Sequence, residues 1–289
     1  MPDTAWAPPP LSSWAPMIIN VALTGAVPSK SDTPELPITP EEVIDDIFRC
    51  AEAGASIFHV HIRDEEGLPV QRAESYEEIF GTVRAKMPEL VLCATTSGRV
   101  DPDPRARMTA LDLDEEVRPE MASLTLGSFN FPRVVSFNPP ETIEALLARM
   151  KEQGVKPELE VFELGMINTA RVLIKKGLIG ERPYFNILLG SMGAAPAFVG
   201  DLARIVERLP EGSEWAAAGV GVFQRTMVVA GAVMGGNVRT GLEDNPRLPE
   251  DPPASNEKAV RFAAEAARLV GRGVATPSET RDRLGLVQR

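Results

Sequence analysis

Short runs of apolar residues alternate along the chain with longer segments in which apolar and polar residues repeat at helical spacing. Continuous apolar runs of this kind are typical of strands that are buried on both faces of a parallel sheet. We predict strands at 18–23, 56–62, 90–95, 121–124, 159–162, 184–189, 215–218 and 237–240. Helices are predicted at 40–53, 75–86, 105–113, 140–152, 169–176, 197–208, 226–234 and 256–270.

Eight strand–helix units in a chain of 289 residues predict an α/β fold, in the form of a closed (β/α)8 TIM barrel. The helix ends agree with this assignment: Thr39 and Glu42 are spaced as a capping box, and Gly54 and Gly154 follow predicted helices. A doubly wound open sheet is the alternative. No GxGxxG motif follows the first strand, which disfavours a dinucleotide-binding sheet.

The beginning of the chain differs in composition from the rest. Residues 1–16 are rich in proline, which is incompatible with a helix, so we predict an extended N-terminal segment there. This segment is either disordered or packed as an arm on a neighbouring subunit. Residues 17–289 are predicted to form a single barrel domain.

Composition and charge narrow the classes of function. The chain has 30 Lys and Arg against 41 Asp and Glu, a net charge of −11, so it lacks the basic surface of a nucleic-acid or membrane-surface protein. An acidic surface still permits a locally positive site for an anionic substrate. Cys50 and Cys93 form no CxxC pair, and no apolar run approaches the length of a membrane span. We therefore expect a cytoplasmic protein without disulfides.

The two histidines of the chain, His59 and His61, lie two positions apart at the end of the second predicted strand. Alternate residues of a strand point to the same face, so both imidazoles are expected at the barrel mouth, where TIM barrels keep their active sites. This arrangement suits two metal ligands, and a hydrogen-bonded histidine pair is the alternative. Glu243 is the leading candidate for a third ligand, although a solvated loop carboxylate is the ordinary role for such a residue.

Arg239 and Asp244 lie in the same short segment as Glu243. An arginine beside an aspartate keeps the carboxylate ionised and oriented, as a general base requires. A structural ion pair at the barrel rim is the alternative. Asp64 follows the histidines and is interpreted as a partner of a metal ligand or as a loop cap.

Small polar residues end two further strands and could bind the oxygens of a small substrate: Thr95 with Thr96, and Ser128 with Asn130. Helix caps are the ordinary role of such residues. Glu158 and Glu160 share one face of the fifth strand, with Glu163 beyond its end. A carboxylate inside a barrel needs a partner, so we expect Glu160 to meet an Arg, a Lys or the metal site, in a structural more than a catalytic role.

Two glycine-rich loops follow the sixth and seventh strands, at 188–196 and 219–223. Their backbone amides could bind a phosphate or a thioester-linked cofactor, and simple tight turns explain them equally well. The candidate cofactor-binding residues are Gly190, Gly193, Gly219 and Gly221.

At this point the sequence resembles the β-keto acid cleavage enzymes, from about Ile18 to Leu286. The segments that carry the resemblance are AGASIFHVHIRDEEGLP, MASLTLGSFNF, PELEVFELGM and GGNVRTGLEDN. The histidine segment and the RTGLEDN segment are far apart and complementary, which makes the match specific.

The resemblance implies a zinc-binding TIM barrel, usually tetrameric, that converts a β-keto acid and acetyl-CoA into acetoacetate and a new acyl-CoA. One zinc ion per chain would be held by His59, His61 and Glu243. The catalytic pair of the family matches Arg239 and Asp244. The contacts to the substrate carboxylate match Thr95, Ser128 and Asn130.

Val27 departs from the founding pattern of this family, in which a glutamate after TGA meets the amino group of the substrate. The aromatic–histidine pair that is common after GxG is also absent, with Phe223 and Gln224 there instead. We therefore expect Val27 to line the pocket and an uncharged or apolar β-keto acid to be preferred. The alternatives are a zinc-dependent aldolase or hydrolase that acts on keto acids without coenzyme A, and a non-catalytic metabolite-binding barrel.

Overall fold

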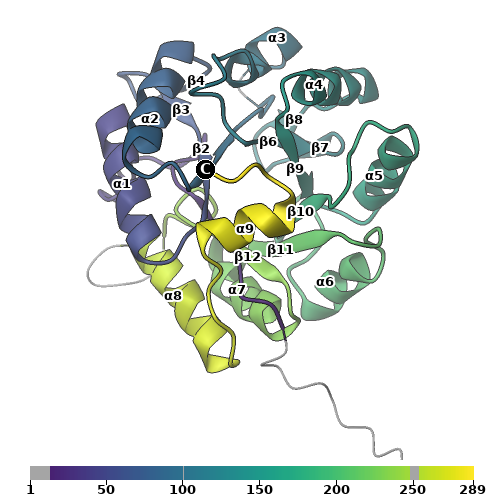
Figure 1. Ribbon diagram of the computed structural model, residues 1–289. Coiled ribbons are helices and arrows are strands. Elements are labelled where there is room, and N and C mark those ends of the chain that lie inside the picture. Colours follow the sequence, from purple (N-terminus) through teal and green to yellow (C-terminus); the bar gives the residue numbers. More distant parts are fainter. Residues whose placement is uncertain (1–13, 100, 248–253) are drawn as a thin grey trace, which may run out of the picture.

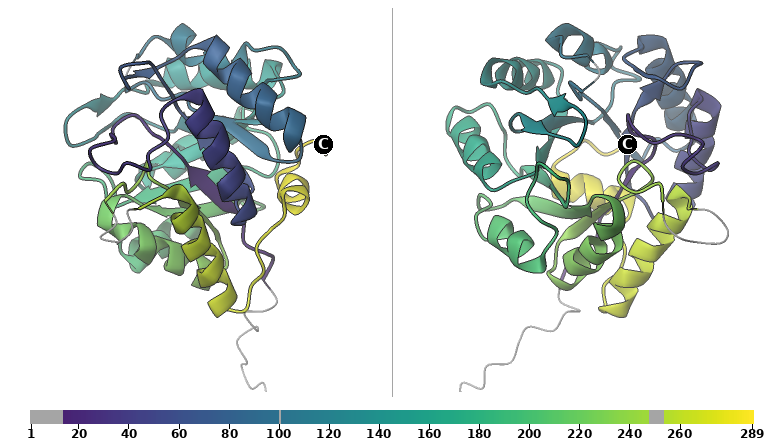
Figure 2. Two further views of the ribbon diagram at one scale, coloured as in Figure 1. Left: turned by 90° about the vertical axis from the view of Figure 1, so that its left-hand side faces the viewer. Right: turned by 180° about the vertical axis from the view of Figure 1, so that it is seen from behind.

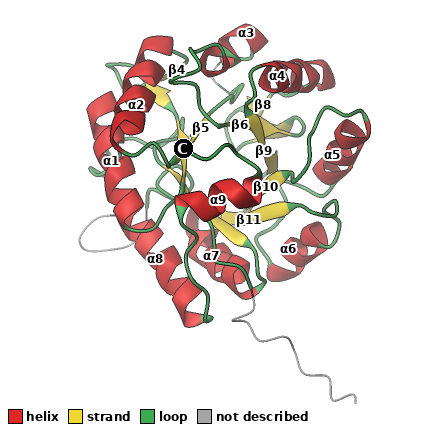
Figure 3. Ribbon diagram, viewed as in Figure 1, coloured by secondary structure: helices red, strands yellow, loops and turns green. Residues whose placement is uncertain are grey.

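The computed structural model describes residues 14–99, 101–247 and 254–289 and shows a closed barrel of eight parallel strands (Figures 1 and 3). The last strand pairs in parallel with the first, with Ile19 opposite Val238, and this pairing closes the ring. The strands of the barrel, in their order around it, are β1 (Ile19–Ala22), β2 (Ile57–Val60), β5 (Val91–Ala94), β6 (Met121–Thr125), β9 (Lys156–Val161), β10 (Tyr184–Leu189), β11 (Glu214–Gly219) and β12 (Asn237–Thr240). The predicted TIM barrel is confirmed.

Helices surround the barrel on its outer face (Figure 2). They are α1 (Pro40–Glu52), α2 (Ala73–Lys86), α3 (Pro104–Arg107), α4 (Pro140–Glu152), α5 (Gly165–Lys175), α6 (Val199–Val206), α7 (Gln224–Val233), α8 (Asn256–Leu269) and α9 (Pro277–Leu284), with short 3-10 turns η2 (Thr109–Leu111) and η3 (Gly221–Phe223). Each helix that the sequence predicts is present. The region predicted as one helix at 105–113 is divided between α3 and η2.

Local end signals set the helix boundaries as predicted. The Thr39 side chain accepts a hydrogen bond from the Glu42 amide, and the Glu42 carboxylate accepts one from the Thr39 amide, so α1 begins with a complete capping box. Gly54, with φ of +112°, and Gly154, with φ of +68°, follow the ends of α1 and α4. Glycine adopts these angles without the steric cost that a side chain would impose.

Three elements are absent from the sequence prediction. Two are small hairpins on the loops at the barrel mouth, β3 (Ile62–Arg63) with β4 (Pro69–Val70), and β7 (Phe129–Asn130) with β8 (Val135–Ser136). The third is α9, which covers the other end of the barrel (Figure 1). Its side chains attach mainly through polar contacts, such as the hydrogen bond from Thr280 to Ser56, and therefore leave no apolar periodicity in the sequence.

The barrel interior changes from apolar to polar along its axis. Ile18, Ile57 and Val91 pack with Leu284 of α9 at the amino ends of the strands. Towards the carboxyl ends the inward-facing residues are polar and buried, among them His59 and Arg239. The interior therefore supplies a packed floor beneath a polar centre at the mouth.

The predicted N-terminal segment falls mostly outside the described residues, which begin at Trp14. This tryptophan packs against Gly235, and Arg272 lies over its ring. Among the helices of the described ranges, none combines the length and the hydropathy that crossing a membrane requires.

Candidate active site

His59, His61 and Glu243 come together at the carboxyl ends of the strands. His59 is the last but one residue of β2 and His61 follows the strand, while Glu243 lies in the turn after β12, two strands away around the barrel. The two Nε2 atoms are 3.3 Å apart, and the Glu243 carboxylate lies 3.4 Å from His61 Nε2 and 3.8 Å from His59 Nε2. All three side chains are nearly inaccessible to solvent. The predicted trio is therefore one cluster.

Glu158 fixes the orientation of the first histidine. Its carboxylate lies 2.7 Å from His59 Nδ1, so this nitrogen donates to Glu158 and leaves Nε2 to face the cluster. Although burial disfavours a charged carboxylate, His59 and Arg239 lower the pKa of Glu158 to about 2, and it acts as an acceptor only. Burial lowers the pKa of His61 to about 4, so its ring is neutral and able to coordinate.

The role of Glu158 is missed by the sequence analysis, although its alternation with Glu160 already placed both carboxylates on one face. Of the two roles expected for Asp64, the structure supports the loop cap, because its carboxylate accepts hydrogen bonds from the amides of Glu66 and Leu68. It is Glu158 that contacts a histidine of the cluster.

The cluster fits a divalent cation. Glu243 Oε2 is buried and has no hydrogen-bond partner among the described residues, which is costly unless another group pairs with it. Two imidazole nitrogens and a carboxylate oxygen are a common ligand set for zinc, and tetrahedral bonds of 2.0–2.1 Å place ligand atoms about 3.4 Å apart. The distances of 3.3 to 3.8 Å in the cluster agree with this spacing.

A second group of metal-binding types consists of His59, Cys93 and Glu158. Its Cys93 Sγ lies 3.8 Å from His59 Nδ1, the nitrogen already bound to Glu158. Burial raises the pKa of the Cys93 thiol well above its usual value, which disfavours the thiolate that a metal requires. The group with His61 and Glu243 is therefore the better metal site.

Arg239 joins the cluster to Asp244. Its Nε is 2.9 Å from Asp244 Oδ2 and its Nη2 is 2.9 Å from the Glu243 carboxylate. Nη1 lies 3.4 Å from Glu160, which also accepts from Thr125. The expectation that Glu160 meets an arginine is confirmed.

The surroundings of Asp244 act on its pKa in opposite directions. Burial raises the pKa of this carboxyl above its usual value, and the Arg239 guanidinium offsets part of the rise. The expected contact between Arg239 and Asp244 is present, and the role of Asp244 as a base stays a prediction. A raised pKa suits a general base, since a carboxylate of ordinary pKa binds protons weakly at neutral pH.

A cavity of about 350 Å³ adjoins His61. It lies among the loop after β1, the β3–β4 hairpin and the segment after β5. Its lining residues are Ala26, His61, Ile62, Pro69, Val70, Gln71, Thr95, Ser97, Asp101 and Ala106. The cavity therefore has both apolar and polar walls, with Asp101 as its one carboxylate.

Of the predicted substrate-binding residues, Thr95 lines this cavity and the other three lie elsewhere. Val27 is 72% exposed, and its neighbour Ala26 takes the place on the cavity wall that was expected for it. Ser128 and Asn130 are exposed on the segment of the β7–β8 hairpin. The Ser128 hydroxyl accepts from the Asn138 amide, which is a local structural bond.

The four predicted cofactor-binding glycines occupy tight backbone positions. Gly193 and Gly219 lie against the backbone of Asn130 and Phe223, too close to admit a side chain. Gly190 and Gly221 have φ of +94° and +64°, and the Gly221 amide donates to the Asp244 carbonyl. The tight turns account for all four glycines, and coenzyme binding by these loops stays a prediction.

Three further arginines lie on the segments at the mouth of the barrel. Arg63 donates to the carbonyls of Gly25, Gly67 and Pro28, and Arg107 donates to Thr96 and Phe137 carbonyls. Arg99 lies over the Phe131 ring. Within the described ranges none of the three pairs with a carboxylate, so their charge is available to attract an anionic substrate.

We expect Gly25→Ala to weaken metal binding by about 10–100-fold, the range found when a neighbour of a metal ligand is disturbed. Gly25 has φ of +64°, and a Cβ there would lie 2.5 Å from Glu243 Cγ. Metal affinity is measured by competition with a chromogenic chelator. Gly180→Ala is the control, since no atom lies within 4 Å of its added Cβ, and equal affinities for both variants would contradict the prediction.

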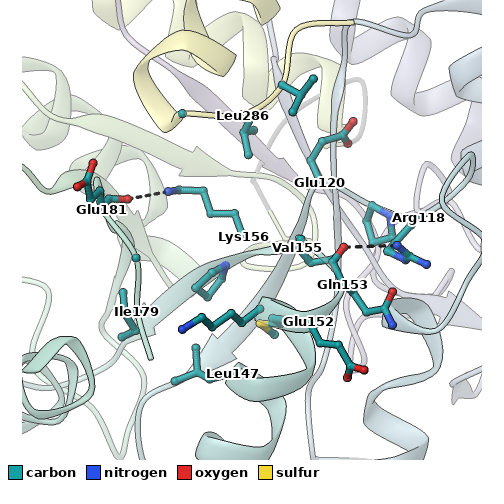
Figure 4. Close-up of a pocket in the computed structure, with 18 of the residues that line it drawn as sticks. Arg118, Glu120, Leu147, Glu152, Gln153, Val155, Lys156, Ile179, Glu181 and Leu286 are labelled. Carbon is teal, nitrogen blue, oxygen red and sulfur yellow. Dashed lines mark hydrogen bonds between the residues drawn. The ribbon is translucent and has the colours of Figure 1, made fainter. Parts of the chain in front are cut away.

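A larger cavity lies elsewhere, at the amino ends of the strands (Figure 4). It contains neither histidine and none of the catalytic candidates, so it is not the active site of the barrel.

Comparison with known proteins agrees with the site geometry. A profile of the beta-keto acid cleavage enzyme family matches residues 16–286. The chain is 38% identical over 272 residues to a 3-keto-5-aminohexanoate cleavage enzyme of Fusobacterium nucleatum, covering 93% of this chain and 98% of that protein. It is 37% identical over 275 residues to a 3-oxoadipate:acetyl-CoA acetyltransferase of Cupriavidus necator, covering 94% of this chain and 95% of the relative.

Among solved structures, the fold is similar to a ternary complex of ObcA with a C4-CoA adduct and oxalate, with a TM-score of 0.79 at 22% identity. The match covers 88% of this chain and 68% of that one, and at this identity it supports the fold alone. The family match and the curated relatives each extend over most of the barrel, including the two histidines and the turn after β12. The chain therefore belongs to the β-keto acid cleavage enzyme family.

Proposed function

We propose that this protein is a zinc-dependent enzyme that condenses a β-keto acid with acetyl-CoA to give acetoacetate and a new acyl-CoA. The observation that carries the proposal is the direct contact between the His59–His61–Glu243 cluster and the Arg239–Asp244 pair. A candidate metal site and a candidate base thus share one guanidinium. The names of the relatives, which include acetyl-CoA-dependent acyl transfer, support the same reaction class.

Each residue of the site has a separate role in this proposal. Bound at the cluster, zinc would supply a Lewis acid for the keto group of the substrate. Asp244 removes a proton from the carbon between the keto group and the carboxylate, which prepares that carbon to attack the acetyl thioester. Arg239 holds Asp244 through two hydrogen bonds, and Glu158 holds the His59 ring. Thr95, at the edge of the cavity, is placed to meet a substrate oxygen.

We propose that the substrate has an uncharged or apolar tail. Ile62, Pro69 and Val70 form an apolar wall of the cavity beside His61, against which an uncharged carbon chain can pack. Each methylene that enters such a cavity contributes about 0.8 kcal/mol to binding.

Ala26→Glu is expected to lower kcat/KM for an apolar β-keto acid relative to an amino-substituted one, because Ala26 lines the cavity and the change adds a carboxylate to its wall. The measurement is kcat/KM for 3-keto-5-aminohexanoate and 3-oxohexanoate, in the wild type and in the variant. Val27→Glu is the control, because Val27 is 72% exposed and does not line the cavity. A wild-type preference for the amino substrate would contradict the proposed tail and would implicate Asp101 as its partner.

The function is tested by incubating a panel of β-keto acids with and without acetyl-CoA. Mass spectrometry then shows whether a new acyl-CoA forms in step with acetoacetate. Turnover of a keto acid without acetyl-CoA would favour the alternative, a zinc-dependent aldolase or hydrolase. Absence of any turnover by metal-loaded protein would favour a metabolite-binding barrel.

We further propose a cytoplasmic homotetramer, the state that the family resemblance implies. Large apolar side chains on loops at the mouth support self-association: Met192 is 72% exposed, Phe198 69% and Val222 82%. Exposed apolar groups gathered on one face are typical of an interface.

A further inference from the structure

A second cavity lies at the end of the barrel opposite the histidine cluster. Its volume is about 740 Å³, within the range of small-molecule sites. It is bounded by the start of β9, the end of α4, the loop at 177–183 and the C-terminal segment at 285–289 (Figure 4). We call it the basal cavity.

The cationic side chains of the basal cavity have mostly backbone partners. Lys156, at the centre of Figure 4, donates to the Glu181 carbonyl at 3.3 Å. Arg118 donates to the carbonyls of Leu113 and Gln153, at 2.9 and 3.4 Å. Neither Lys156 nor Arg118 forms an ion pair with a carboxylate in the part of the chain that the structure describes. Both charges are therefore balanced only by carbonyl dipoles.

The buried carboxylate of this region is already shared. Glu120 is within 2.7 Å of Arg84, 2.9 Å of Arg281 and 3.3 Å of Arg289, so three guanidinium groups compete for one carboxylate. Glu152, at the rim, lies 2.6 Å from Arg149. Glu115 and Glu181 also line the cavity, but neither forms an ion pair with Lys156 or Arg118 among the described residues.

Lys156 is partly buried and has no carboxylate partner among the described residues. Burial and the nearby Arg182 lower the pKa of its ammonium group to about 8, because both disfavour the charged form. An oxyanion in the cavity would replace part of the lost hydration and would offset the repulsion from Arg182.

The walls around Lys156 are apolar and indicate what else the ligand carries. Leu147, Val155, Ile179 and Leu286 line the cavity around the lysine (Figure 4). Inorganic phosphate would leave these walls unfilled. An organic anion would place its charged group at Lys156 and its carbon chain against them.

We propose that the basal cavity is a binding site for a small organic anion, whose carboxylate or phosphate group pairs with Lys156. This site is distinct from the catalytic mouth and does not depend on the proposed function. Amino ends of TIM-barrel strands ordinarily contribute stability alone, so a ligand there would be an additional property of this chain.

The test is isothermal titration of the metal-loaded protein with hexanoate, hexyl phosphate, 1-hexanol and inorganic phosphate. We expect hexanoate or hexyl phosphate to bind, and the comparison of these two identifies the preferred head group. Hexanol and inorganic phosphate are expected to bind at least tenfold more weakly, because hexanol lacks the anionic group and inorganic phosphate lacks the carbon chain. Binding of hexanoate at the active site would remain when Lys156 is changed. Binding at the basal cavity is therefore the part of the titration signal that the Lys156 variant removes.

Lys156→Met is expected to weaken this component at least tenfold while leaving turnover with acetyl-CoA unchanged. Lys175→Met is the matched control, because Lys175 is exposed and does not line the cavity. Arg118→Met should weaken binding by a smaller factor and replaces Lys156→Met if that variant does not fold. The proposal is overturned if the wild type binds neither anion at about 10 mM, or if Lys156→Met and Arg118→Met both bind as the wild type does.

Discussion

Replacement of His61 by alanine is expected to strip the bound metal and to lower kcat more than about a thousandfold. Loss of a group that only orients a ligand typically costs 10–100-fold in metal affinity, and loss of a ligand should cost more. The remaining groups would be His59 and Glu243, whose closest atoms are 3.8 Å apart. Two ligands do not hold zinc in competition with water.

The measurement is metal content by mass spectrometry after dialysis, together with the rate of acyl-CoA formation. Wild-type protein should carry about one divalent ion per chain. Asp64→Asn is the control, since Asp64 lies in the same segment but caps a loop, and it should keep both metal and activity. Stoichiometric metal in the His61→Ala protein would show that the cluster is not the metal site.

The barrel could be predicted from the sequence because its strands are short buried runs that alternate with helical segments. The runs predicted at 184–189 and 237–240 coincide with observed strands, although they include the buried polar residues Asn186 and Arg239. Elements held by polar contacts leave no such pattern. In α9 the buried Arg281 binds Glu120 and the carbonyl of Leu90, contacts with residues more than a hundred positions earlier in the chain.

The cluster of His59, His61 and Glu243 could be predicted because alternation along one strand places the two histidines on the same face. The contact of His59 with Glu158 spans 99 positions, and only the closure of the barrel brings these residues together. The rise in the Asp244 pKa could not be predicted from the sequence for a related reason. Burial, the largest cause of that shift, depends on the whole fold and cannot be read from the neighbouring arginine.

The buried charges of the site also explain why its residues depend on one another. Arg239 lies within 3.8 Å of four carboxylates, those of Glu158, Glu160, Glu243 and Asp244. One guanidinium cannot neutralise four buried carboxylates, and a divalent cation at the cluster would supply the missing positive charge. The metal is therefore expected to stabilise the folded barrel as well as to assist the reaction.

Asp244→Asn is expected to separate the base from the metal site, lowering kcat by roughly 10²–10⁴ while leaving metal content unchanged. Asparagine has nearly the same shape as aspartate and can still accept a hydrogen bond from Arg239, but it cannot take up a proton. Asp244 does not belong to the candidate ligand group, so the metal should stay bound.

The measurement pairs steady-state kinetics with metal analysis of the same preparation. Because the variant changes a proton-transfer step, kcat should fall more than KM changes. Glu243→Gln is the matched comparison: it alters the adjacent carboxylate in the same way, but it should lose metal because it alters a ligand. If Asp244→Asn keeps activity within a few-fold of the wild type, Asp244 only positions Arg239. Glu160, which also contacts that guanidinium and accepts from Thr125, would then be the next candidate for the base.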